Sequence, residues 1–96
     1  MKYTVYYSRL MVSSLAEAPA AVDRAGYRLI GEVEADSLED LFRRMNAVDG
    51  SEIEMPQRLG CRSMSVGDVA VDEEGDAHYC ASFGWEPVYV TDWSVP

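Results

Sequence analysis

The pattern of apolar and polar positions predicts short strands near both ends of the chain. Aromatic and β-branched residues alternate roughly over 3–7, in the sequence YTVYY, which is typical of a strand. A second strand is predicted directly after Gly26, in YRLIGEVEA, although Ile30 interrupts the alternation there. Further strands are expected at 69–71, 77–83 and 87–93.

Two helices are predicted, one between the first two strands and one after the second strand. Pro19 lies in an alanine-rich stretch that ends at a glycine, and because proline fits the first turn of a helix but not its interior, the first helix is expected to begin near Pro19. The second helix is expected over 37–48, where a serine can cap the free amides and acidic residues follow in the first turn. Leu41, Phe42 and Met45 recur there at helical spacing, so we expect them to face the sheet.

These elements predict one α+β domain over 1–96, with a mainly antiparallel sheet of about five strands and two helices packed on one face. Segment 51–61 has no sustained period and contains a proline and a glycine, which favours an exposed connecting loop. The acidic segment 72–76 is expected to be a hairpin loop.

The net charge changes the picture of what such a domain can bind. Seventeen acidic residues against eight basic ones give a formal charge of −9, which argues against direct binding to nucleic acid or to an anionic membrane. The partner is expected to be basic, or a small molecule. No apolar run approaches the ~18 residues of a membrane span, and the start of the chain does not resemble a signal peptide. We therefore expect a cytoplasmic protein, a monomer rather than an oligomer.

Residues that could carry catalysis are few. His78 is the only histidine, and it lies two residues from Cys80 on a predicted strand, so a Cys–His pair is the one conceivable catalytic arrangement. We interpret these two as a structural histidine and a buried thiol, and Cys61 as a free thiol as well. Segment 72–76 lacks the ligand spacing of a calcium loop, and no phosphate-binding glycine motif occurs. Neither an enzyme nor a metal or other cofactor is expected.

The acidic residues are distributed unevenly along the chain. Eight lie in 32–54 beside two arginines, and seven lie in 63–96, which contains neither lysine nor arginine. One interpretation is solubility alone. The other is that the carboxylates imitate the phosphates of a nucleic acid and occupy the basic groove of a protein that binds one. The residue types leave both open. Aromatic residues among the acids are candidates to anchor such a contact, although about half should be core: Tyr79, Phe83, Trp85, Tyr89 and Trp93.

Three segments between Leu38 and Val88 read LEDLFRRMN, RSMSVGDVAV and HYCASFGWEPV. They resemble the YodL-like and large-polyvalent-protein-associated small domains of phages, plasmids and conjugative elements, with Trp85 where phenylalanine is commoner. The resemblance covers about half of the chain. It implies a counter-defence setting rather than a defined activity. In the second motif we interpret Gly67 and Asp68 as turn residues rather than catalytic ones.

The sequence thus predicts a non-enzymatic, mobile-element-encoded inhibitor. Its expected partner is a basic nucleic-acid-binding protein of a host defence complex, as for anti-CRISPR or antirestriction proteins. The alternative is an accessory protein-interaction domain of a phage or plasmid protein whose acidity serves only solubility. The residues predicted to contact the partner are Asp72, Glu73, Glu74, Asp76, Glu52, Glu54, Glu86 and Trp85.

Overall fold

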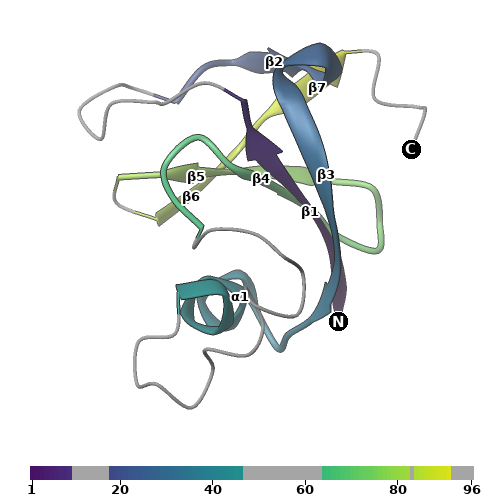
Figure 1. The fold of residues 1–96 in the computed structure, drawn as a ribbon, viewed down its shortest axis with the longest axis vertical. Coiled ribbons are helices and arrows are strands. Elements are labelled where there is room, and N and C mark those ends of the chain that lie inside the picture. The colour runs from purple at the N-terminus through teal and green to yellow at the C-terminus, as the bar shows by residue number, and fades with distance from the viewer. Residues whose placement is uncertain (10–17, 47–63, 83, 92–96) are drawn as a thin grey trace.

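A computed structural model describes residues 1–9, 18–46, 64–82 and 84–91 (Figure 1). Five strands form one sheet in the order β3-β1-β4-β5-β6, and two short strands, β2 and β7, form a second, parallel pair. One α-helix, α1, and one turn of 3₁₀-helix, η1, complete the described part. The elements are β1 (Lys2–Ser8), β2 (Ala21–Asp23), η1 (Arg24–Gly26), β3 (Tyr27–Glu34), α1 (Leu38–Asn46), β4 (Val69–Val71), β5 (Ala77–Ala81), β6 (Gly84–Pro87) and β7 (Tyr89–Thr91).

Strand β1 lies inside the five-stranded sheet, between β3 and β4, and all pairings within that sheet are antiparallel. Its aromatic and β-branched side chains can be buried because both faces of the sheet are covered. Pairing with β3 runs from Lys2 opposite Glu34 to Ser8 opposite Tyr27, with a register shift between Val5 and Tyr6. The shift leaves Ile30 without a partner in the register, which accounts for the break in alternation at this residue.

Each face of the sheet carries its own apolar core. On one face, side chains of β1, β4 and β5 pack against Leu41 and Met45 of α1. On the other face, Tyr6, Tyr27 and Tyr79 belong to a second buried cluster, against which the valines of β2 and β7 pack. Figure 1 shows α1 below the sheet and the β2–β7 pair above it. The expectation of two helices on one face is therefore wrong: one face is covered by α1 and the other by the parallel strand pair.

The predicted helix beginning near Pro19 is replaced by β2 and η1. Ala21 pairs in register with Tyr89 of β7, and Tyr89 N–H donates to the carbonyl of Ala20 at 3.0 Å. These partners come from the far end of the chain, so tertiary pairing overrides the helix propensity of the alanines. The predicted strand 87–93 is likewise divided, because β6 and β7 belong to different sheets.

Helix α1 confirms the second predicted helix, with its described part ending at Asn46. The Ser37 hydroxyl accepts a hydrogen bond from the Asp40 amide at 3.1 Å, as expected of a cap. Leu41 and Met45 are fully buried, whereas Phe42 is 38% exposed. The expectation that Phe42 also faces the sheet is wrong. Leu41 and Met45, four residues apart, form the buried side of the helix, and Phe42 lies at the edge of that side.

The segment before β4 confirms the structural interpretation of the SVGD motif. Gly67 has a φ of 102°, a conformation that favours glycine. The carboxylate of Asp68 is completely buried and accepts hydrogen bonds from the amides of Ser8 and Ser65, at 2.9 and 2.8 Å. Asp68 thus joins this turn to the end of β1. The predicted loop at 51–61 lies outside the described residues.

Candidate protein-binding site

The hairpin loop between β4 and β5 is built around Asp72, whose side chain points inward. One carboxylate oxygen accepts from the amides of Glu74 and Asp76, at 2.9 and 3.0 Å, and the other lies 2.9 Å from His78 Nε2. Only 14% of the Asp72 side chain is exposed. These contacts, the hydrogen bond from His78 first, lower the pKa of Asp72 below its ordinary value. Asp72 therefore holds the loop in shape, whereas Glu73, Glu74 and Asp76 of the same loop are exposed.

Glu73 connects the hairpin to the beginning of β1. Its carboxylate accepts from the Lys2 amide at 2.8 Å, while Lys2 pairs across the sheet with Glu34. Glu34 in turn lies 3.0 Å from the amino group of Met1, with 72% of its side chain exposed. Carboxylates from two separate segments thus meet at the first residues of the chain.

The first turn of α1 brings a third acidic segment to the same place. Burial raises the pKa of the Tyr3 hydroxyl, and the negative charges of Asp72, Glu39 and Glu73 raise it further. The charges of all three carboxylates therefore act on one buried tyrosine, although they come from α1 and from the hairpin. We call the exposed members of this region the acidic end: Glu34, Asp36, Glu39, Glu73, Glu74 and Asp76.

The two carboxylates of the first helical turn differ in their surroundings. The Asp40 carboxylate accepts hydrogen bonds from Arg43 and Arg44 at 2.6 and 2.9 Å. Its pKa lies well below the ordinary range because of the hydrogen bond from the Asp36 amide and those from the two guanidinium groups. Within the described part of the chain, no hydrogen bond or ion pair to Glu39 is found. The charge of Asp40 is therefore balanced by Arg43 and Arg44, whereas no such balance is found for Glu39 among the described residues.

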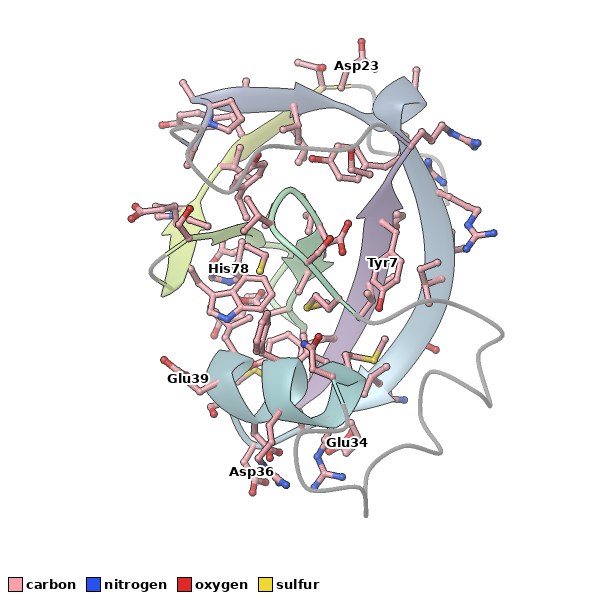
Figure 2. All side chains as sticks on the ribbon, turned by 60° about the vertical axis from the view of Figure 1, so that its left-hand side comes forward. Tyr7, Asp23, Glu34, Asp36, Glu39 and His78 are labelled. Atoms are coloured by element: carbon pink, nitrogen blue, oxygen red, sulfur yellow. The ribbon has the colours of Figure 1, made fainter. Side chains whose placement is uncertain are left out.

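Arginines of the described chain that do not pair with Asp40 gather at the opposite end of β1. Arg28 pairs across the sheet with Tyr7, Arg9 donates its amide to the Gly26 carbonyl at 2.9 Å, and the Arg24 guanidinium lies 4.9 Å from the centre of the Tyr6 ring. Figure 2 shows Glu34, Asp36 and Glu39 around α1 and Asp23 at the far end of the molecule. These three arginines are therefore separated from Glu34 by the ~20 Å of a seven-residue strand, while Lys2, Arg43 and Arg44 lie near the acidic end and Asp23 lies at the arginine end (Figure 2).

The remaining predicted contact residues lie elsewhere or are not described. Glu86 of β6 is exposed and is the cross-strand partner of Tyr79, which places it on the sheet face away from α1. The structure therefore does not bring Glu86 to the acidic end. Glu52 and Glu54 lie outside the described residues. Among the aromatic candidates Tyr79 is buried and Tyr89 is 81% exposed, while Phe83 and Trp93 are also outside the described part.

Trp85 lines an open hollow beside the acidic end. It pairs across the sheet with Cys80 and packs partly against the core under α1. The hollow has a volume of about 240 Å³ and a mainly apolar lining. Its lining residues come from α1 on one side and from β5, β6 and the turn between them on the other: Glu39, Phe42, Cys80, Ala81, Ser82, Gly84 and Trp85.

The Cys80 and His78 pair does not have the geometry of a catalytic dyad. Cys80 is 3% exposed, and burial raises its pKa to about 11, whereas a nucleophilic thiol needs a lowered pKa. His78 is bonded to Asp72 rather than to the thiol. Within the described part of the chain, no group of three or more His, Cys, Asp or Glu side chains is arranged to hold a metal. In the same part no helix is long and apolar enough to cross a membrane.

Sequence reasoning missed Glu39 and Phe42 as members of this surface. Their spacing of three within a helix was a usable signal, because residues i and i+3 share one side of a helix. Phe42 was assigned to the core with Leu41, and Glu39 to the helix dipole alone. Glu34 and Asp36 also stood in a recognised acidic stretch, but nothing in the sequence placed them beside the hairpin.

The fold and this surface define a small α+β protein with an acidic end and an adjoining apolar hollow. The family model described as YodL-like domain matches residues 3–90, and the chain therefore belongs to the YodL-like domain family. None of the curated proteins matches the chain, and no solved structure matches it.

Proposed function

We propose that this protein is a non-enzymatic binding module whose acidic end occupies a basic, nucleic-acid-binding surface of a partner protein. The observation that carries the proposal is the convergence of carboxylates from β3, α1 and the β4–β5 hairpin around the start of β1. Charge gathered in this way from separate segments gives a strong local field, which steers a basic partner and orients it.

Separation of the charges supports a directed contact rather than general solubility. Acids distributed for solubility alone would be interspersed with bases. Here Arg9, Arg24 and Arg28 lie at the other end of β1, with Asp23 as one acid among them, and Arg43 and Arg44 near the acidic end are paired with Asp40 (Figure 2). A basic groove is therefore attracted more strongly to the acidic end than to the arginine end. The resulting orientation is what a substitute for nucleic acid requires.

We place the partner among host defence complexes that bind nucleic acid, and the protein among inhibitors encoded by mobile elements. This step rests on the counter-defence setting that the family resemblance implies. The acidic end would then exclude the nucleic acid from its groove, as an anti-CRISPR or antirestriction protein does. No cofactor and no catalytic step is needed for such an action.

A plasmid-transformation experiment tests the proposal. Bacteria whose restriction or CRISPR system attacks the plasmid are transformed with and without expression of the protein, across a panel of such systems. Wild type is expected to raise the transformation efficiency against at least one system. The acidic-end variant, with Glu39→Gln, Glu74→Gln and Asp76→Asn, is expected to lose most of this effect, because these side chains are exposed and carry the proposed contact.

A matched variant controls for net charge. Asp23→Asn, Glu32→Gln and Glu86→Gln together also change the charge by three units, from −9 to −6, but at exposed positions outside the acidic end. This variant is expected to protect as well as wild type. An equal loss of protection in both variants would show that net charge alone produces the effect. No protection by wild type against any system would contradict the proposal. Binding that does not respond to salt would favour the accessory interaction domain instead.

A further inference from the structure

The hollow between α1 and the β5–β6 hairpin has the size of a side-chain site rather than of a cofactor site. Its volume of about 240 Å³ is below the roughly 300 to 1,000 Å³ of sites for drug-sized ligands. Phe42 and Trp85, on opposite sides, are both incompletely buried. An apolar hollow with aromatic walls on a protein surface is suited to one long side chain of another protein.

The charge at the rim selects among such side chains. Glu39 lines the hollow, and its carboxylate has no hydrogen bond or ion pair within the described residues, whereas the neighbouring Asp40 is balanced by Arg43 and Arg44. The hollow thus offers two aromatic side chains and an uncompensated negative charge in its lining. A cationic side chain with an apolar stem matches both features.

We propose that this hollow binds an arginine side chain of the partner protein. Arginine fits better than lysine because its planar guanidinium stacks on aromatic rings and can meet a carboxylate with two parallel hydrogen bonds. The stem of the arginine lies against Phe42 and Trp85, and the guanidinium reaches Glu39. This inference rests on the proposed function for the source of the arginine, since basic nucleic-acid-binding grooves are rich in this residue.

A titration with small probes tests the site without the partner. The ¹⁵N–¹H signal of the Trp85 indole is followed in a Trp93→Phe protein while N-acetyl-arginine amide is added. Saturable shifts are expected, with the isosteric, uncharged N-acetyl-citrulline amide binding roughly fivefold or more weakly, because the cation contributes both the aromatic and the carboxylate contact. The absence of saturation up to about 50 mM arginine amide would overturn the proposal.

Two pairs of variants locate the contact. Glu39→Gln and Phe42→Ala are each expected to weaken arginine binding about fivefold. Glu86→Gln removes the same charge from the neighbour of Trp85 but on the other sheet face, and Leu29→Ala removes an apolar side chain that is 43% exposed on β3. Both controls are expected to bind as wild type does. Unchanged binding in Glu39→Gln, or equal binding of citrulline, would show that the hollow does not recognise the cation.

The outcomes separate this inference from the proposed function. Arginine binding without protection in the transformation assay would leave the hollow as a site and contradict the inhibitor role. Protection that depends on the acidic end, with no arginine binding, would refute arginine binding by the hollow and still support the inhibitor role.

Discussion

Replacing Asp68 with alanine should be among the most damaging single changes in the turn before β4. The change removes the acceptor of two amides, those of Ser8 and Ser65, which the carboxylate holds at 2.9 and 2.8 Å. An unsatisfied buried donor costs about 1 to 3 kcal/mol, and Ser65 is exposed, so water can reach its amide after the substitution. We therefore expect a loss of about 2 to 4 kcal/mol, a large share of the roughly 5 to 15 kcal/mol that stabilises a typical domain.

Urea unfolding followed by tryptophan fluorescence measures this loss as a change in midpoint at constant slope. Asp68→Asn is expected to lose about half as much, because the amide oxygen still accepts one of the two hydrogen bonds. Asp76→Ala is the matched control: it removes an exposed carboxylate of the neighbouring loop and should change the free energy of unfolding by less than about 0.5 kcal/mol. A wild-type midpoint for Asp68→Ala would refute the role assigned to this carboxylate.

Three further predictions follow from the described contacts. Asp40 and Asp72 have lowered pKa values in the folded protein, so their contribution to stability is present above the ordinary carboxyl pKa of about 4 and is lost as the pH falls through the lowered values. Unfolding titrations should therefore show stability falling below pH ~4, and less steeply in an Asp40→Asn, Asp72→Asn protein. Tyr27→Phe should cost about 1 kcal/mol in a thermal melt, because the Gly67 carbonyl loses a hydroxyl donor at 2.7 Å; an unchanged melting temperature would argue against that bond. In a Cys61→Ser protein, Cys80 should react with a thiol reagent far more slowly than a free cysteine peptide, since its pKa is raised to about 11, and a fast reaction would contradict its burial.

Local patterns in the sequence were sufficient for the elements whose partners lie close along the chain. The β4–β5 hairpin and its acidic loop follow from two apolar runs around a glycine, and α1 from its cap and its buried pair Leu41 and Met45. β1 and β3 were also predicted, because both are rich in strand-forming residues. What these elements share is agreement between local preference and the final fold.

The rest depended on contacts that no local pattern encodes. β2 pairs with β7 from the other end of the chain, so the alanines of 20–21 enter a strand pair instead of a helix. Asp72 was expected to face a partner with its neighbours, but its carboxylate completes the loop and bonds to His78. Such a role is visible only when the loop geometry is known. Glu39 belongs to the site because α1 lies next to the β5–β6 hairpin, and no local sequence pattern predicts that α1 packs there.

The most direct test of the central claim measures competition for a nucleic-acid groove. A defence complex against which the transformation assay shows protection is purified, and its binding to a fluorescent DNA or RNA ligand is followed while the protein is added. We predict displacement at near-stoichiometric amounts, strong attenuation at high salt, and displacement by the Asp23→Asn, Glu32→Gln, Glu86→Gln control but not by the Glu39→Gln, Glu74→Gln, Asp76→Asn variant. Nucleic acid that stays bound at saturating wild-type protein, or equal displacement by the acidic-end variant, would contradict the account.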